Sequence, residues 1–386
     1  HHPIEGFGLV GQVKAGKLSP SEAEAMLPQM TCGAGSCVGL YTANTMAVVT
    51  EVLGMSVSGC ATTPAVDPKK LGQAYETGRR MVDLVKSQVC ARDIMTQAAF
   101  ENAIRVDMAM GGSTNTVLHI PAIAQESGIH ISVEKFDDIS RKTPNICSII
   151  PAGPYEMWDI HEAGGIPAVL SRLTPMLNDT RTVEGLTLKQ AAEQGRVRDD
   201  EVIRPLDRPY HAQGGIAVLK GNMAHSAVIK QTAVDEDMLI HSGPAKVFFS
   251  ETDLLDALDA KGIQEGDVVV LPYQGPAGAP GMPEMLTPTD AIKGAGYRRV
   301  ALITDGRFSG ATTGPCIGHV EMEAYNGGAI GAIRDGDVIE MDIPSRRLNV
   351  RLTQEEIRER LKDTHPPHRE ISSLLRSFRE KYQGIN

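Results

Sequence analysis

The chain has 386 residues, enough for a large core and for two domains of ordinary size. Its apolar fraction of 41% and charged fraction of 22% are typical of a soluble globular protein. The formal net charge of −10 argues against nucleic acids and acidic membrane surfaces as partners, because both require a basic face.

Six scattered cysteines and the absence of a signal-peptide pattern or a bilayer-length apolar run indicate a reducing compartment. We therefore expect a cytoplasmic protein, or one of an organelle matrix in a eukaryote. The chain opens His1-His2 and has no initiator Met, so we expect a fragment or a tag remnant.

The first half is predicted to be rich in helices. Ser19 is a candidate N-cap, Pro20 fits the first helical position, and Glu22 completes a capping box for a helix over 19–27. Further helices are predicted over 40–56, 69–88, 97–112, 115–128 and 158–173. Glycines end two of them, at Gly54 and at Gly111-Gly112, and Ser113-Thr114 are expected to cap the next.

The pattern changes near residue 200, where short β-rich runs begin between Gly, Pro and Asp residues. These runs cover 214–222, 226–231, 245–250, 267–273, 299–306, 328–344 and 347–353. Several strands at this spacing indicate a sandwich or a barrel. A solvated amphipathic helix is predicted within the basic stretch 364–383.

The stretch 31-TCGAGSCVGLYTANTMAVV-49 places Cys37 among glycines, just before a predicted helix. The positive end of a helix lowers the pKa of a nearby thiol, and glycines let backbone approach a bulky inorganic group. These features suit an iron–sulfur or metal ligand. A plain structural thiol fits the spacing as well, since no CxxC pair accompanies it.

Two later loops also hold candidate chemistry. In 274-QGPAGAPGMPEML-286 a rigid loop precedes Glu284, whose carboxylate would suit Mg²⁺, unless Glu284 is only a solvated residue after a Gly/Pro connection. In 304-TDGRFSGATTG-314 the turn residue Ser309 follows an apolar strand, where a substrate could reach it. Because Arg307 stands two residues earlier, this is not a GxSxG elbow, and Ser309 would need activation.

The fourth candidate is 107-DMAMGGSTNTVLH-119. Small residues that lead into a helix can bind an anion through N–H donors. Helix packing together with capping explains the same residues, and we favour that role.

Five stretches, in this order, resemble the dihydroxy-acid and phosphogluconate dehydratase family: 32-CGAGSCVGLYTANTM-46, 99-AFENAIRVDMAMGGSTNTVLH-119, 214-GGIAVLKGN-222, 275-GPAGAPGMPEML-286 and 302-LITDGRFSGATTG-314. The second resembles the dihydroxy-acid branch more than the sugar-acid branches. The resemblance implies an α/β N-terminal domain followed by a β-barrel domain, assembled as a homodimer. We expect the first domain over 1–178, a linker over 179–204 and the barrel over 205–386.

The resemblance also implies the chemistry and the residues that perform it. The reaction would be dehydration of a 2,3-dihydroxy acid to a 2-oxo acid, in branched-chain amino-acid biosynthesis. Cys37 would be a ligand of an iron–sulfur cluster (2Fe-2S or 4Fe-4S), Glu284 a ligand of Mg²⁺, and Ser309 the base that removes the C2 proton. A cluster iron would accept the C3 hydroxyl, and Mg²⁺ would hold the carboxylate and the 2-hydroxyl.

The chain departs from the family pattern at its start. Family members carry other cluster and Mg²⁺ ligands in an N-terminal portion that has no counterpart in residues 1–36. We therefore expect a fragment or a truncated form, or a missing part that another chain supplies. Two alternatives stay open: a sugar-acid or 6-phosphogluconate dehydratase, with Arg307 near a phosphate, and a non-catalytic remnant.

Overall fold

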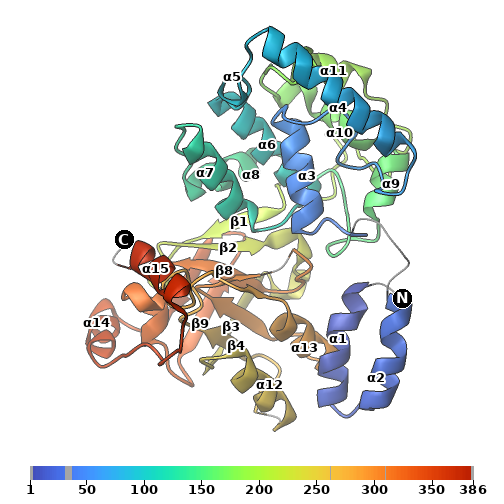
Figure 1. Cartoon of the computed structure of the whole chain (residues 1–386). Coiled ribbons are helices and arrows are strands. Elements are labelled where there is room, and N and C mark those ends of the chain that lie inside the picture. Colours follow the sequence, from blue (N-terminus) through green and yellow to red (C-terminus); the bar gives the residue numbers. More distant parts are fainter. Residues whose placement is uncertain (1–2, 31–36, 261, 309, 384–386) are drawn as a thin grey trace. The chain divides into compact units, whose positions relative to one another are not determined.

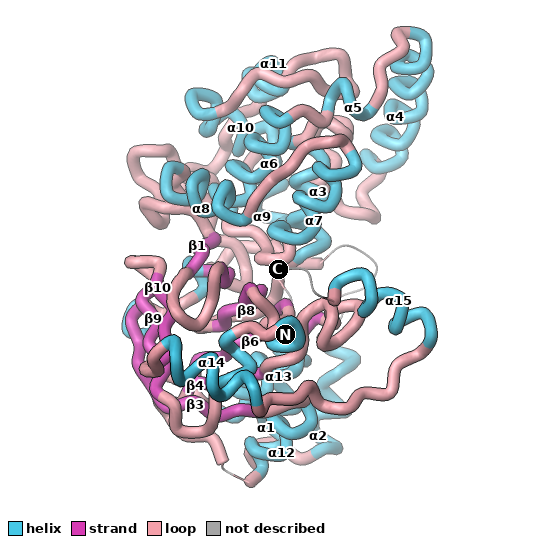
Figure 2. The backbone as a smooth tube through the Cα atoms, turned by 90° about the vertical axis from the view of Figure 1, so that its left-hand side faces the viewer, coloured by secondary structure: helices cyan, strands magenta, loops and turns pink. Residues whose placement is uncertain are grey.

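The computed structural model describes residues 3–30, 37–260, 262–308 and 310–383. The chain divides into two compact units. The helical unit is Gly33–Ile216, and the sheet unit combines His1–Cys32 with Ala217–Asn386. The described strands all lie between residues 216 and 350, and Figure 2 draws strands in magenta and helices in cyan.

The helical unit is built around one buried helix, α6 (Gln97–Met110). Successive turns of α6 bury Phe100, Ile104 and Met108 completely, and the helix packs against other helices of this unit (Figure 1). The other helices of the unit are α3 (Thr42–Val52), α4 (Lys69–Lys86), α5 (Ala91–Ile94), α7 (Thr116–Glu126), α8 (Val133–Lys142), α9 (Met157–Glu162), α10 (Gly165–Leu173) and α11 (Leu188–Gln194). The predicted helix-rich first half is confirmed.

Two details of this unit differ from the sequence prediction. The predicted helix over 158–173 is two helices, α9 and α10, because Gly164 and Gly165 adopt φ of 122° and 69°, which a continuous helix excludes. The N-cap of α7 is Asn115, not Ser113 or Thr114, and its side chain makes no cap hydrogen bond. Gly111, by contrast, ends α6 as predicted, and it does so in a left-handed conformation.

The sheet unit holds an eight-stranded sheet in the order β1-β2-β8-β6-β4-β3-β9-β10. Its strands are β1 (Ile216–Leu219), β2 (Ser226–Lys230), β3 (Ile240–Val247), β4 (Val268–Leu271), β6 (Ala301–Thr304), β8 (Cys316–Glu321), β9 (Val338–Asp342) and β10 (Arg347–Val350). The central strands β3, β4, β6 and β8 run parallel, and the flanking pairs β2·β8, β3·β9 and β9·β10 are antiparallel.

The two edges of this sheet nearly meet, which makes it barrel-like. Just after β1, Lys220 bridges to Arg347, the first residue of β10, and Leu348 N donates to Lys220 O at 2.9 Å. Close approach here requires Gly221, because an added Cβ would lie 2.0 Å from Leu348 O. The predicted fold class, a helix-rich α/β region followed by a barrel, is confirmed.

Alternation along β4 explains why this barrel has two apolar cores. Val268 and Val270 join an interior cluster to which all eight strands contribute. Val269 and Leu271 point the other way, into a second cluster with the outer helices α12 (Glu251–Asp259) and α13 (Thr287–Ala295). Both faces of the central strands are therefore covered, as parallel sheets require.

Residues 3–30 pack with the sheet unit, although the sequence analysis placed them in the first domain. Helix α1 (Pro3–Lys14) lies against α13, and α2 (Pro20–Met26) lies beside α1 (Figure 1). The close approach depends on glycines: a Cβ at Gly11 would lie 2.1 Å from Ala291 O, and one at Gly294 would lie 2.2 Å from Gly8 O. The predicted capping box of α2, with Ser19 and Glu22, is present.

The predicted β-runs match strands with two exceptions, and β8 was not predicted. The run over 245–250 is the end of the longer β3, and the first part of 328–344 forms a short 3-10 turn at Ala329–Ala332 before β9. The remaining elements of the unit are α14 (Gln354–Lys362), the terminal helix α15 (Ser373–Tyr382) and the short pair β5 (Glu284–Met285) and β7 (Arg307–Phe308). Within the described ranges, no helix is long and apolar enough to cross a membrane.

Candidate active site

Two of the predicted motifs meet at one edge of the barrel sheet. Strands β4 and β6 are parallel neighbours, so the loops that leave their carboxyl ends emerge on the same side. The first loop runs on into β5 and the second into β7, and these two short strands pair with each other in parallel register. The structure thus brings the segment around Glu284 beside the segment around Arg307. Loops at the carboxyl ends of parallel strands are where ligands bind in α/β folds.

A buried carboxylate, Asp305, holds these loops together. Its oxygens accept backbone N–H bonds from Tyr273 at 3.0 Å, Gln274 at 2.7 Å and Ala324 at 2.8 Å. Only 2% of the residue is exposed, and burial raises its pKa to about 6, with the nearby charge of Glu323 acting in the same direction. The side chain therefore links its own segment to two others, 273–274 and the one that holds Ala324. Sequence reasoning passed over Asp305 because an Asp at a strand end resembles an ordinary turn residue.

A second buried carboxylate occupies the glycine-rich loop. Glu323 accepts from the backbone N–H groups of Ala277 and Gly278, both at 3.0 Å, and burial raises its pKa. Gly275 leaves room for it, since a Cβ there would lie 2.4 Å from Glu323 Oε2. The loop was expected to offer backbone to a ligand. At Ala277 and Gly278 those donors are already used by the protein itself.

Glu284 begins β5 with its side chain one-third exposed. Its Oε1 accepts from Nη1 of Arg307 at 2.8 Å, and Nε of Arg307 donates to Met282 O at 2.6 Å. The arginine therefore ties the two loops together through both a carboxylate and a carbonyl. The predicted catalytic residue Ser309 follows β7 directly in sequence, and it lies outside the described residues, as does Cys32.

Cys37 belongs to the helical unit, where its backbone is firmly positioned. The amide of Asn44 donates to Cys37 O at 2.7 Å and to Gly39 O at 2.8 Å. Val38 O accepts from Met157 N at 2.7 Å. The thiol itself is exposed and free. α3 begins at Thr42, slightly later than predicted, so Cys37 lies in the segment that leads to the helix and not in its first turn.

The motif GGSTNT (residues 111–116) makes hydrogen bonds to the start of the helix that follows Cys37. The buried hydroxyl of Ser113 lies 3.1 Å from Thr42 Oγ1, which also accepts from Nδ2 of Asn115 at 2.9 Å. Ser113 N in turn donates to Thr45 Oγ1 at 3.2 Å. These bonds fix the start of α3. The favoured structural interpretation of 107–119, packing between helices, agrees with these contacts.

The donors present were tested against the predicted metal groups. A free thiol suits iron and a carboxylate suits Mg²⁺, so Cys37 and Glu284 each have appropriate chemistry. In the described part of the chain, however, no three His, Cys, Asp or Glu side chains gather closely enough to hold a metal ion. Glu284 already faces a cation, Arg307. These residues alone do not fit a cluster or a magnesium site.

A third buried acid differs from Asp305 and Glu323 in its hydrogen bonding. Asp290, in the first turn of α13, is 5% exposed, and among the described residues its Oδ2 has no hydrogen-bond partner. Burial raises its pKa to about 7, opposed only by Lys293. Because the folded-state pKa lies above the ordinary value of 3.8, the folded protein binds the extra proton, and stability falls as pH rises through the window between them.

We therefore expect Asp290→Asn to stabilise the protein at pH 8 and to have little effect at pH 4. One pKa unit corresponds to about 1.4 kcal/mol, and relaxation around a buried group reduces the full amount, so the expected gain at pH 8 is about 2 kcal/mol. Urea unfolding at both pH values measures it. An equal change at the two pH values would contradict the assignment to ionisation.

The comparisons with known proteins also divide the chain in two, but they include residues 3–30 in the first part. Residues 3–191 match the model of the dihydroxy-acid/6-phosphogluconate dehydratase N-terminal domain, and residues 201–385 match that of the C-terminal domain. A protein of Thermodesulfovibrio yellowstonii named dihydroxy-acid dehydratase is 52% identical over 378 residues, which cover 97% of this chain and 68% of the relative. One of Methanothermobacter thermautotrophicus with the same name is 51% identical over 98% of this chain and 69% of its own length.

The chain therefore belongs to the dihydroxy-acid/6-phosphogluconate dehydratase family. A dehydratase eliminates water, so the prediction of an enzyme of the hydro-lyase class is confirmed. The family resemblance drawn from the five motifs is confirmed as well.

Proposed function

We propose that this protein dehydrates 2,3-dihydroxy carboxylic acids to 2-oxo acids. The observation that carries the proposal is the likeness to proteins named dihydroxy-acid dehydratase, which extends over 97% of the chain. The product class also fits the proposed place in branched-chain amino-acid biosynthesis, because a 2-oxo acid is what a transamination converts into an amino acid.

Proton removal is the step we assign to this chain's own residues. The C2 proton of such a substrate lies beside a carboxylate and is poorly acidic, so its removal needs a positioned base. We propose Ser309 for this role. The neighbouring elements support the assignment: β7 ends at Phe308, and its pairing with β5 holds the segment before Ser309 at the edge where the two loops meet.

We further propose Cys37 as a ligand of an iron–sulfur cluster and Glu284 as a ligand of Mg²⁺, each completed by donors outside the described residues. When bound, these groups would supply Lewis acidity toward the leaving hydroxyl and toward the substrate carboxylate. Glu284→Gln would remove the negative charge and keep the shape. In the assay below, it should raise the Mg²⁺ concentration needed for activity.

The alternative substrate, 6-phosphogluconate, gains no support from Arg307. A phosphate site would draw on several of the five N–H donors of that guanidinium, whereas Nη1 already donates to Glu284 and Nε to Met282 O. The dihydroxy-acid reaction makes no such demand on Arg307.

The test is an anaerobic assay of the protein as its gene encodes it, supplied with iron, sulfide and Mg²⁺. We expect 2-oxo acid, trapped as its hydrazone, from 2,3-dihydroxy-3-methylbutanoate, and a kcat/KM at least 10²-fold lower on 6-phosphogluconate, on the order of what unpaired polar groups cost. The reverse preference would overturn the proposal in favour of the sugar-acid branch.

A further inference from the structure

The last part of the chain lines an open cavity of the sheet unit. The cavity has a volume of about 800 Å³. It is lined by the loop 366–371, which connects α14 to α15 (Figure 2), by two arginines of α15 and by Tyr325. Neither Glu284 nor Arg307 lines it, so the ion pair of the candidate site does not belong to this cavity. A volume of this size is typical of a site for a small molecule.

Helix α15 is fixed beside this cavity by hydrogen bonds to distant parts of the chain. Nε of Arg379 donates to Ala277 O at 2.9 Å, and its Nη2 donates to Gly278 O at 3.3 Å. Nδ2 of Asn326 donates to Tyr382 O, at the end of α15, at 3.1 Å. The wall that α15 provides is therefore positioned by the protein's own groups.

The lining is rich in arginine and poor in acid. The guanidinium groups of Arg369, Arg376 and Arg379 line the cavity with a single carboxylate, that of Glu370. Among the described residues, none of these four side chains forms an ion pair. Burial lowers the pKa of Arg369, and the charge of Arg379 acts in the same direction against that of Asp305. In a chain of formal net charge −10, such a concentration of positive charge is local.

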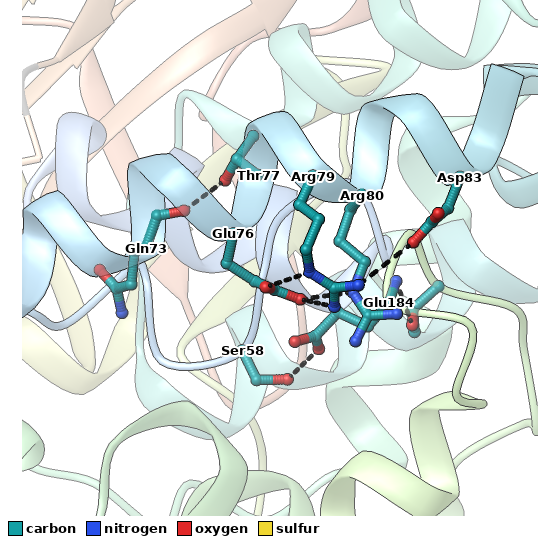
Figure 3. Close-up of polar contacts among 9 residues, drawn as sticks. Ser58, Gln73, Glu76, Thr77, Arg79, Arg80, Asp83 and Glu184 are labelled. Atoms are coloured by element: carbon teal, nitrogen blue, oxygen red, sulfur yellow. Dashed lines mark hydrogen bonds and ion pairs between the residues drawn. The ribbon is translucent and has the colours of Figure 1, made fainter.

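The neighbouring arginines of α4 show the usual alternative, which is neutralisation by carboxylates. Glu76 accepts from Nη2 of Arg79 and from Nε of Arg80, both at 2.7 Å, and Arg79 also contacts Asp83 at 3.5 Å (Figure 3). The arginines of the cavity have no such partners. Because like charges repel, an anion placed among them would lower the free energy of the folded protein.

The three guanidinium groups also keep hydrogen-bond donors for a ligand. Each has five N–H donors. Arg369 gives one of them, at Nη2, to Phe249 O at 3.1 Å, and Arg379 gives those at Nε and Nη2 to the two loop carbonyls. The side chain of Arg376 makes no hydrogen bond to any described residue.

A phosphoryl group matches this arrangement better than a carboxylate does. It is tetrahedral, carries up to two negative charges, and presents several oxygens that can accept from more than one guanidinium at once. A carboxylate has one charge and two oxygens. The ring of Tyr325 and two prolines, Pro366 and Pro367, complete the lining, and an organic group attached to the phosphate could pack against them.

We infer that this cavity is a binding site for a small molecule that carries phosphoryl groups, which Arg369, Arg376 and Arg379 hold together. The inference does not depend on the reaction proposed above. The ligand is either a free phosphate or an organic phosphate, since both present the same charged oxygens to the three guanidinium groups.

Titration calorimetry with pyrophosphate tests the inference on the protein as its gene encodes it, in a buffer without Mg²⁺. Arg376→Gln removes an exposed guanidinium that holds no other part of the described chain, so folding should be unaffected. The variant should bind pyrophosphate about 10- to 100-fold more weakly, which is the contribution of a charge-assisted hydrogen bond. Lys381→Gln is the matched control, because it removes the same charge from an exposed α15 residue that does not line the cavity. Its affinity should stay within about twofold of the wild type, since solvent screens an exposed charge.

Two further ligands identify the chemical class. Adenosine diphosphate carries the same two phosphoryl groups with an organic portion. If it binds more tightly than pyrophosphate, the site takes an organic phosphate, and if it does not, the site takes a free one. Succinate, with two carboxylates, should bind at least about 10-fold more weakly than pyrophosphate, because it offers fewer oxygens to each guanidinium. No binding of pyrophosphate, an equal affinity for succinate, or equal losses in Arg376→Gln and Lys381→Gln would overturn the inference.

Discussion

Replacing Ser309 by Ala is expected to reduce kcat by about 10²–10⁴-fold, the usual contribution of a positioned base. Folding should be unaffected, because the change removes one hydroxyl from a residue that follows a two-residue strand and precedes a glycine. If Ser309 removes the C2 proton, solvent deuterium should enter C2 of recovered substrate with the wild-type enzyme. The same exchange should be lost in Ser309→Ala. Steady-state assays and mass spectrometry of the substrate measure the two effects.

A matched control lies in the same segment. Thr313 also carries a hydroxyl, but that hydroxyl accepts from Nζ of Lys293 at 3.1 Å on the surface. Thr313→Ala should therefore keep both kcat and the deuterium exchange. If Ser309→Ala kept most of its kcat and still exchanged the C2 proton, Ser309 would be an ordinary turn residue. The base would then have to be sought among other groups.

Local signals predicted the helical elements well, because each depends on a few neighbouring residues. The capping box of α2 and the left-handed Gly111 after α6 are bonded within one turn of the chain, so the sequence pattern contains their cause. The break between α9 and α10 was missed although both glycines were visible. Either Gly could have continued a helix, and only packing shows otherwise: a Cβ at Gly164 would lie 2.3 Å from Arg196 O.

The sheet order depends on contacts between distant residues. β8 pairs with β6 on one side and with β2 on the other, and its sequence 316-CIGHVE-321 lacks the β-branched run that marks its neighbours. Helices α12 and α13 were not predicted in a half that otherwise shows strands. They follow from the need to cover the outer face of β4 and β6, which is a property of the assembled sheet.

The residues of the candidate site also fall into two groups, those that the sequence predicted and those that it did not. Motifs predicted Glu284 and Arg307 as residues of interest, and the pairing of β5 with β7 brings them to 2.8 Å. Nothing in the sequence distinguished Asp305 or Glu323 from exposed acids. Their importance comes from burial, which makes an unpaired carboxylate costly and a fully bonded one a strong link between loops.

Replacing Asp305 by Ala is the sharpest test of that link, and it should lower the free energy of unfolding by about 3–5 kcal/mol. The carboxylate binds three buried backbone N–H groups, of Tyr273, Gln274 and Ala324, which Ala would leave without a partner. Each unpaired buried donor costs about 1–3 kcal/mol, and removing a desolvated charge offsets part of the sum. Urea unfolding at pH 7 measures the loss. Asp335→Asn is the control, because that exposed carboxylate accepts one backbone bond, from Val247, and should matter by less than about 1 kcal/mol.

The pH dependence of the Asp305→Ala effect reports the burial of this carboxyl, because desolvation raises its pKa against the three backbone hydrogen bonds that lower it. The pKa of Asp305 is raised from 3.8 to about 6, so the folded state holds a proton that the unfolded state has lost between these values. Its contribution to stability is therefore complete below pH 4 and declines as pH rises to 6. Ala cannot titrate. The variant should thus be destabilised more at pH 4 than at pH 7, by up to about 3 kcal/mol for a shift of this size. An equal loss at both pH values would contradict the raised pKa of Asp305.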